Sequence, residues 1–331
     1  MRRYGLLLAL AGWALAAPAL AETRDIGSAG YAARVELHPF ETLTLTDEQF
    51  LKGTADEGKP VTIAGSLRIP RGGTDRLPVV ILMHGSGGIG NYVEFWQREL
   101  NALGVSTFAI DGFTGRGLTN VNGNQALLAR TNFILDIYRS LGVLAKHPRV
   151  DPQRVAIMGF SRGGQAALYA SVERFAHLWN KSGVVPALYL PFYPDCAITF
   201  KADTDVADRP IRIFGGSSDD YNPPASCASY VERLKAAGKD AQITVYPNAQ
   251  HVFDIPFGPE TPMTVEGGQT VRNCKISEDA SSHLINTVTG APFTYTDSCV
   301  ERGPHYGPNA AARSAAWQAV RDILTRTFNL K

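Results

Sequence analysis

The segment VAIMGFSRGGQAALYA, residues 155–170, places a serine between two glycines where one local pattern gives way to another. An apolar run typical of a buried strand precedes the serine, and an alanine-rich stretch typical of a helix follows it. Gly159, Ser161 and Gly163 fit G-x-S-x-G, in which a nucleophile occupies a sharp strand-to-helix turn with no room for side chains at the glycines. A purely structural Gly-Ser turn is the alternative, but the order strand, turn, helix favours the nucleophile.

Apolar runs and helical stripes alternate along most of the chain, which predicts βα units and a mainly parallel sheet, an α/β fold. An edge strand is expected at LTLTD, residues 43–47. The further strands expected are 61–70, 77–83, 105–110, 154–160, 187–194, 211–216 and 242–247. The helices expected are 92–103, 124–146, 163–177, 225–237 and 310–328.

Residues 22–331 are predicted to form a single domain that carries an insertion at about 255–307. This insertion is rich in Gly, Pro, Thr, Ser and Asn and shows little periodicity. A loop of this length inside a domain is usually functional. Whether it covers Ser161 as a lid is left open by the sequence.

The first 21 residues have the features of a secretory signal peptide. Arg2 and Arg3 precede a short apolar stretch that ends in Ala19-Leu20-Ala21, and cleavage is expected after Ala21. The alternative is a membrane anchor, but the apolar stretch is short for a bilayer span. We therefore expect a periplasmic or secreted protein without a stable membrane anchor. Loss of the two arginines changes the formal net charge from +1 to −1, and with no basic block this argues against nucleic acid as a partner.

A serine hydroxyl needs a base to become a good nucleophile. In folds with this turn the acid and the histidine follow the serine in that order. His251, in YPNAQHVFD, lies in a loop directly after a predicted strand and is the expected base. The other histidines after the turn lie in the following helix or in the insertion: His177, His283 and His305.

The acid is expected in the loop after the strand at 211–216, where Asp219 and Asp220 are neighbours. A buried carboxylate there would hold the imidazole in its working tautomer. The spacing from Gly216 through Asp219 to Pro223 favours Asp219, with Asp220 as the rival.

Charge that develops on a substrate carbonyl oxygen needs fixed N–H donors. The backbone amide of Arg162 is one candidate, and the loop HGSGG supplies a second from Ser86 or Gly87. Glycines in that loop let the backbone approach a ligand closely. A phosphate-binding loop is the competing interpretation, but no lysine follows as in a Walker motif. His84 precedes the turn in the chain and is interpreted as structural.

Four stretches, ILMHGSGGIG, GFSRGG, GGSSDDYNPPASC and YPNAQHVFD, together resemble the dienelactone hydrolase family of α/β-hydrolases over roughly residues 60–254 and again at the final helix. The resemblance implies an eight-stranded, mostly parallel sheet flanked by helices on both faces. It also implies hydrolysis of esters or lactones without a metal or organic cofactor. Founding members carry cysteine as nucleophile, whereas this chain has Ser161. That difference and the insertion favour a more general carboxylic-ester hydrolase over the namesake activity.

Further residues are candidates for substrate binding. The side chain of Arg162 could bind an anionic group, although a residue there is more often exposed or paired with a carboxylate. Arg116 lies in a loop after a strand, where such sites occur. Tyr221 and Phe253 are candidates for the lining of the pocket.

The four cysteines include no C-x-x-C pair, and their even number in an exported chain favours two disulfides. Three pairings are possible. Cys196 and Cys227 follow neighbouring predicted strands, while Cys274 and Cys299 lie in the insertion. We therefore predict Cys196–Cys227 and Cys274–Cys299.

The sequence thus predicts a serine hydrolase that cleaves a small-molecule ester or lactone through an acyl-enzyme on Ser161. A peptidase with the same nucleophile is one alternative. A non-catalytic binding protein on the same fold is the other, and the presence of all three triad candidates disfavours it.

Overall fold

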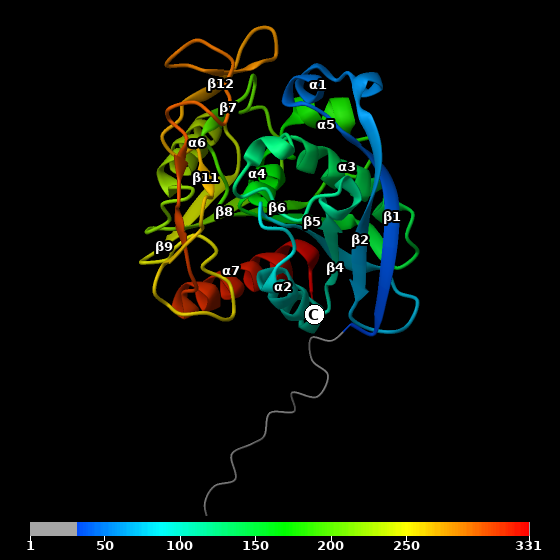
Figure 1. The fold of residues 1–331 in the computed structure, drawn as a ribbon. Helices are drawn as coiled ribbons and strands as arrows, with labels where there is room; N and C mark the ends of the chain where they lie inside the picture. Colours follow the sequence, from blue (N-terminus) through cyan, green and yellow to red (C-terminus); the bar gives the residue numbers. More distant parts are fainter. Residues whose placement is uncertain (1–31, 331) are drawn as a thin grey trace, which may run out of the picture.

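An eight-stranded sheet runs through the molecule with its strands in the order β1-β2-β4-β3-β5-β6-β8-β9 (Figure 1). The computed structural model describes residues 32–330. Its strands are β1 (Arg34–Thr44), β2 (Lys59–Ile69), β3 (Leu77–Met83), β4 (Ser106–Asp111), β5 (Val150–Phe160), β6 (Leu188–Phe192), β8 (Ile211–Gly216) and β9 (Ala241–Tyr246). β1 and β4 pair antiparallel with β2, and the pairs from β4 through β9 are parallel. The predicted α/β-hydrolase fold is confirmed.

Helices cover both faces of the sheet because its central strands are buried on both sides. In β3 the side chains alternate: Val79 and Ile81 pack in one hydrophobic cluster, whereas Val80 and Leu82 pack in the other. The helices that contribute to the first cluster are α1 (Asp47–Lys52), α3 (Asn132–Ala145), α4 (Arg162–Tyr169), α5 (Glu173–Trp179) and α6 (Pro224–Ala236). The second cluster is covered by α2 (Asn91–Ala102) and α7 (Ala310–Phe328), which lie together below the sheet in Figure 1.

Two predicted helices differ from those in the structure. The helix expected at 124–146 begins only at Asn132, because Asn124 caps a separate short turn, η3 (Gln125–Leu127). The helix expected at 163–177 is divided into α4 and α5. Val172 is extended at this break and bridges to Val206, so the chain leaves the helix there.

The insertion at 255–307 contains short strands that the sequence did not predict. They are β10 (Met263–Thr264), β11 (Gln269–Thr270), β12 (Ile276–Glu278), β13 (Leu284–Asn286), β14 (Glu301–Arg302) and β15 (His305–Tyr306). β12 pairs with β13 and also with β7 (Ile198–Thr199), which belongs to the chain before the insertion. Strands of two or three residues are too short to show an alternating pattern, so the segment was predicted as loop.

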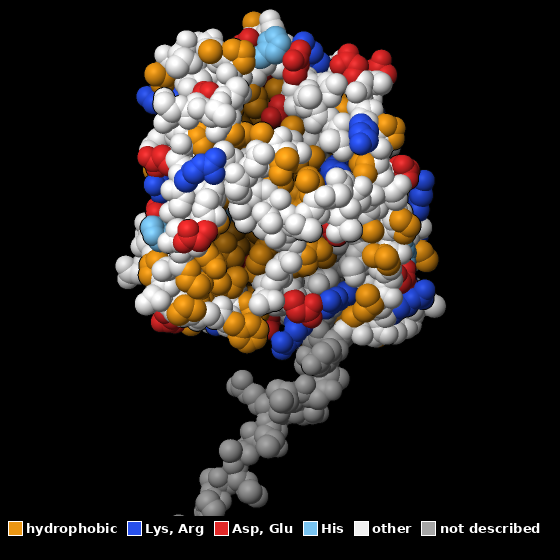
Figure 2. All heavy atoms as spheres, viewed as in Figure 1, with side chains coloured by type: hydrophobic (Ala, Val, Ile, Leu, Met, Phe, Trp, Pro, Cys, Tyr) orange, Lys and Arg blue, Asp and Glu red, His pale blue; other side chains and the backbone are white. Residues whose placement is uncertain are grey.

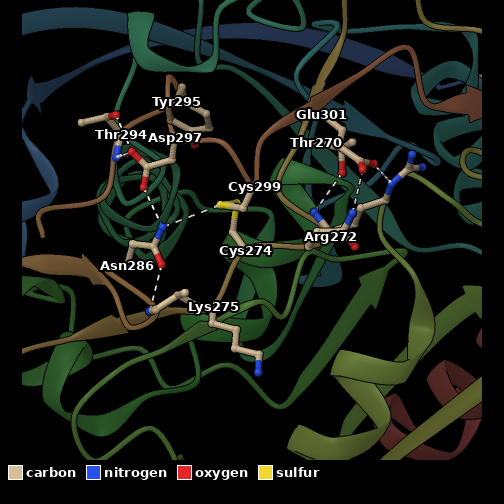
Figure 3. The surroundings of a disulfide bond; sticks show 12 residues. Thr270, Arg272, Cys274, Lys275, Asn286, Thr294, Tyr295, Asp297, Cys299 and Glu301 are labelled. Atoms are coloured by element: carbon tan, nitrogen blue, oxygen red, sulfur yellow. Dashed lines mark hydrogen bonds and ion pairs between the residues drawn. A yellow bond between two sulfur atoms is a disulfide. The ribbon is translucent and has the colours of Figure 1, made fainter. Parts of the chain in front are cut away.

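Both predicted disulfides, Cys196–Cys227 and Cys274–Cys299, are present. Figure 3 shows Cys274–Cys299 between two polar clusters of the insertion. On one side the Asn286 side chain donates a hydrogen bond to Asp297 at 2.9 Å.

The predicted signal peptide, residues 1–21, lies outside the described residues. Within residues 32–330 we find no helix with the length and apolar character that crossing a bilayer requires.

Candidate active site

Ser161 lies at the tip of a tight turn between β5 and α4. Its backbone has φ 56° and ψ −115°, which is a strained conformation for a residue other than glycine. A Cβ atom on Gly159 would come within 1.9 Å of the Gly163 carbonyl oxygen, and one on Gly163 within 2.1 Å of the Met83 carbonyl oxygen. The two glycines are therefore required for the chain to turn here, and the turn presents the hydroxyl at the start of α4.

The structure brings Ser161, His251 and Asp219 together in one line of hydrogen bonds. The Ser161 Oγ lies 2.9 Å from His251 Nε2, and His251 Nδ1 lies 2.8 Å from Asp219 Oδ2. The other carboxylate oxygen of Asp219 accepts from the backbone N–H groups of Tyr221 and Asn222 at 2.9 and 2.8 Å. The carboxylate is thus held in place, and its contact with Nδ1–H leaves Nε2 free to accept the serine proton.

Asp220, the rival acid, points elsewhere. Its carboxylate accepts from the His305 backbone N–H at 2.7 Å and lies 2.8 Å from His305 Nδ1 and 3.2 Å from Arg272 Nη1. Burial alone would raise the pKa of Asp220, but the hydrogen bonds and charges of His305 and Arg272 outweigh it and lower the pKa. Two neighbouring acids therefore serve two different histidines.

The loop after β3 lies directly against the turn at Ser161. A Cβ on Gly85 would be 3.2 Å from the Ser161 Cβ, and Ser86 and Gly87 line the same pocket as Ser161. His84 holds this loop: its Nε2 accepts from the Gly112 N–H at 3.1 Å, and its Nδ1 lies 2.8 Å from the Gly85 carbonyl oxygen. Burial lowers the pKa of His84 to about 4, so the ring is neutral near pH 7.

The side chain of Arg162 does not face the substrate pocket, contrary to the binding role considered from the sequence. It is 3% exposed, donates to Gln125 Oε1 at 3.0 Å and to the Leu128 carbonyl oxygen, and lies over the Phe133 ring. Burial lowers the pKa of its guanidinium to about 10. The backbone amide at the start of α4 is the part of Arg162 that remains a candidate for the site.

Arg116 and Phe253 also differ from expectation. The Arg116 guanidinium forms a buried ion pair with Asp136 at 2.7 Å and donates to the Leu43 and Gly112 carbonyl oxygens, so it joins β1 and α3 and does not line the pocket. Phe253 is fully buried in the hydrophobic cluster that α2 and α7 cover. Only position in the chain had suggested these roles, and tertiary contacts direct both side chains away.

Tyr221 does line the pocket, and it is one of two tyrosines that hold the His251 ring. Its ring stacks on the imidazole at 4.7 Å, and the Tyr193 ring meets the imidazole edge-on at 4.8 Å. Asp254 accepts from the Tyr193 hydroxyl and from Trp96 Nε1, both at 2.7 Å. Burial raises the pKa of Asp254, although these hydrogen bonds oppose the change.

Gln125 connects several parts of the site, and sequence reasoning missed it. Its Oε1 accepts from Ser86 Oγ at 3.1 Å and from Arg162, and its Nε2 donates to the Tyr221 hydroxyl at 3.3 Å. The Gln269 side chain of the insertion accepts from the Gln125 backbone N–H at 2.8 Å. Gln125 lies at the start of the helix predicted over 124–146, so no local pattern could indicate this role.

The pocket in front of Ser161 has a volume of about 630 Å³. The loop after β3 forms one wall, and the insertion forms the other through Met263–Glu266 and Tyr306. Figure 2 shows hydrophobic side chains gathered around a hollow in this face, in the region where Figure 1 draws α7. The insertion thus lines the same pocket as Ser161.

One group of residues in the described chain has the composition of a metal site. Glu36, His38 and His147 place their ligand atoms within 4.8 Å of one another. However, His147 Nδ1 accepts the Arg149 N–H at 3.2 Å, so its Nε2 carries the proton that it shares with Glu36. Metal binding at Nε2 would break that arrangement, and the group fits a hydrogen-bonded cluster at the sheet edge better than a metal centre.

The mostly parallel sheet, flanked by helices on both faces and with a tight turn at Ser161 between β5 and α4, has the architecture of an α/β-hydrolase. The model of the dienelactone hydrolase family matches residues 63–328, and the chain belongs to this family. It is accordingly a hydrolase that acts on esters or lactones.

Two similar proteins illustrate the range of the family. A Yersinia pestis protein named "Putative carboxymethylenebutenolidase" is 28% identical over 200 residues, which cover 56% of this chain and 72% of that protein. The crystal structure of a dienelactone hydrolase-like promiscuous phosphotriesterase from metagenomic libraries matches with a TM-score of 0.55 at 15% identity, over 88% of this chain and 98% of the other. At this identity the structural likeness supports the fold alone.

Proposed function

We propose that this protein cleaves carboxylic esters or lactones through an acyl-enzyme on Ser161. The observation that carries the proposal is the continuous hydrogen-bonded line from Ser161 Oγ through His251 to Asp219, with 2.9 and 2.8 Å between the heavy atoms. The strained backbone at Ser161 supports it, because strain of this kind concentrates at functional sites.

In the first half of the reaction, His251 Nε2 takes the proton of Ser161 while Oγ forms a bond to the carbonyl carbon. The tetrahedral adduct collapses when the bond to the leaving oxygen breaks, and His251 returns the proton to that oxygen. Asp219 stays ionised and stabilises the imidazolium that exists between these two steps. Water then repeats the sequence on the acyl-enzyme, with His251 as base, and releases the acid.

The oxyanion of the adduct needs N–H donors on the side opposite His251. The Arg162 amide at the start of α4 and the amides of Ser86 or Gly87 are the candidates. The close approach of Gly85 to Ser161 supports the loop as a donor, because it brings this backbone next to the reacting carbon. The neutral His84 ring that holds the loop keeps these amides in position.

We also propose that the protein works in an oxidising compartment, the periplasm or the exterior of the cell. The two disulfides favour such an environment. The basic, then apolar, then small-residue pattern of residues 1–21 is the supporting sequence feature.

Turnover of short-chain 4-nitrophenyl esters by the wild type and by Ser161→Ala tests the proposal. Loss of the nucleophile is expected to lower kcat by roughly 10⁴-fold or more. Ser314→Ala is the matched control, because Ser314 is exposed on α7. Wild-type turnover in Ser161→Ala would overturn the assignment, and so would wild-type protein that hydrolyses peptides but no ester.

A further inference from the structure

We propose that the pocket selects esters or lactones whose pocket-facing part is uncharged and apolar, and that it rejects substrates carrying a carboxylate there. This inference rests on the proposed function and names the substrate class of the same site. Three observations carry it. They are the groups that the aromatic side chains present to the pocket, the apolar character of the outer wall, and the charges in the lining.

Three of the four tyrosines that line the pocket already have a protein partner at the hydroxyl. The Tyr92 hydroxyl donates to the Gly88 carbonyl oxygen at 2.9 Å and accepts from the Gly85 N–H. The Tyr193 hydroxyl is used by Asp254, and the Tyr221 hydroxyl accepts from Gln125. Tyr92 and Tyr193 therefore offer a substrate their rings, while the Tyr221 and Tyr306 hydroxyls remain as polar groups in the lining.

The outer wall from the insertion has the same character. Ile255, Phe257, Met263 and Val265 line it, and Phe257 is 72% exposed at the rim. Several apolar side chains gathered at one cavity indicate a binding surface, whereas a single exposed aromatic side chain does not. The wall therefore extends the apolar surface outward from Ser161.

Among the lining residues of the described chain none is Arg or Lys, and Glu266 at the rim is the one acidic residue. The guanidinium nearest in the chain, that of Arg162, is buried behind the turn and already bonded to Gln125 and Leu128. A substrate carboxylate would leave water and find only uncharged polar groups in the lining, such as Asn91 and Asn122, with no arginine or lysine to pair with, which is costly. It would also approach Glu266, and like charges brought together oppose binding.

The proposed preference for uncharged substrates distinguishes this chain from the Yersinia pestis relative. The name carboxymethylenebutenolidase denotes a substrate that bears a carboxyl group as well as a lactone ring. Here the chemistry of the lining opposes that group. The short pairing of β10 with β15 places Met263 and Thr264 at the pocket, so the insertion determines which substrates are accepted.

The test compares two chromogenic esters of equal chain length, 4-nitrophenyl hexanoate and the mono-4-nitrophenyl ester of adipic acid, which ends in a carboxylate. Wild-type kcat/KM is expected to favour the hexanoate by roughly 100-fold, since the charged end finds no arginine or lysine in the lining. Rates with Ser161→Ala are subtracted, which removes spontaneous hydrolysis.

A matched pair of variants then places a cation inside and outside the pocket. Thr264 lines the pocket and Thr261 does not, and both are exposed. At low salt, Thr264→Lys is expected to raise kcat/KM for the adipate ester. The ratio of kcat/KM for hexanoate to that for adipate should therefore fall by roughly tenfold. Thr261→Lys is expected to leave the preference unchanged. Equal unfolding midpoints show that both variants fold.

The outcomes separate the two proposals. If Ser161-dependent turnover of the adipate equals or exceeds that of the hexanoate, the specificity is wrong while the serine hydrolase stands. If Thr264→Lys and Thr261→Lys change the ratio equally, the wall does not set the preference and the inference also fails. If the wild type cleaves neither ester, the proposed function and the inference fail together.

Discussion

The sheet core and the insertion at 255–307 contribute to the same pocket in different ways. The core supplies the proposed nucleophile, acid and base from the loops after β5, β8 and β9, all at the carboxyl ends of parallel strands. The insertion has only two- or three-residue strands, one disulfide and several ion pairs, and it supplies a wall. The difference indicates that the proposed reaction chemistry and the proposed substrate preference come from different parts of the chain.

The two parts meet at neighbouring residues. Asp219 bonds to His251 of the core, and Asp220 bonds to His305 of the insertion. Gly307 donates to the His251 carbonyl oxygen at 3.0 Å, so β15 is also joined to the loop of the base. Asp219 and Asp220 are adjacent in the sequence but bond to different parts of the molecule. Substituting each of them in turn therefore tests the two parts separately.

The largest expected effect comes from Asp219→Asn, which should lower kcat by roughly 10⁴-fold because the amide cannot hold the working tautomer of His251. Asp220→Asn should lower kcat less than tenfold and raise KM, because only the anchor of the insertion weakens. Ester kinetics on both variants measure this. Equal losses of kcat would show that the division between the two acids is not real.

The disulfides sharpen the comparison at the level of stability. Removal of Cys274–Cys299 by Cys274→Ser with Cys299→Ser, or of Cys196–Cys227 by the matching double change, should each cost about 3 kcal/mol in the free energy of unfolding. Only the first should raise KM markedly, because Cys274–Cys299 restrains the insertion. Urea unfolding and ester kinetics test both parts, and an equal rise of KM in the two variants would contradict the account.

Acid should destabilise the core through His84. The unfolded ring takes up a proton near its ordinary pKa of 6.5, whereas the folded ring does so only at about 4. Between these values the unfolded state binds more protons, so the free energy of unfolding falls as the pH is lowered, by about 2 kcal/mol between pH 7 and 5. Urea midpoints should show a smaller fall in His84→Gln than in the wild type.

The control for that change is His305→Gln in the insertion. His305 is partly exposed beside Asp220. We expect this variant to keep the fall in stability that His84 causes. If the fall in stability at low pH disappeared in His305→Gln and persisted in His84→Gln, the acid-sensitive group would lie in the insertion. That result would contradict the account.

The smallest expected effect belongs to Gln125, which joins the two parts by hydrogen bonds. Gln125→Ala should lower kcat/KM by roughly tenfold, because Ser86 and Tyr221 lose a common partner and Arg162 is left with one acceptor fewer. Gln318→Ala, an exposed change on α7, should have no effect. An unchanged kcat/KM in Gln125→Ala would show that the network does not position the site.

Much of the core could be predicted from the sequence. The strands at 77–83 and 211–216 and the helix at 310–328 have the predicted bounds, because each is a long apolar run or a clear helical stripe. The three triad candidates lie together because each follows a strand at one edge of a parallel sheet. Spacing was sufficient to choose Asp219 over Asp220 as the partner of His251.

The features that were missed depend on contacts between distant segments. Arg162 and Arg116 follow strands at the site edge, yet carbonyl oxygens and Asp136 direct their side chains inward. Gln125 acts through Ser86 and Tyr221, and no spacing in the sequence encodes those contacts. The insertion forms strands only by pairing with β7 and within itself, so local propensity could not indicate them.

Labelling with a fluorophosphonate tests the central claim, covalent catalysis at Ser161, most directly. The account predicts one adduct per chain on the peptide that contains Ser161, loss of esterase activity in proportion to labelling, and no adduct in Ser161→Ala. An adduct on another residue, or full ester turnover by the labelled protein, would contradict it.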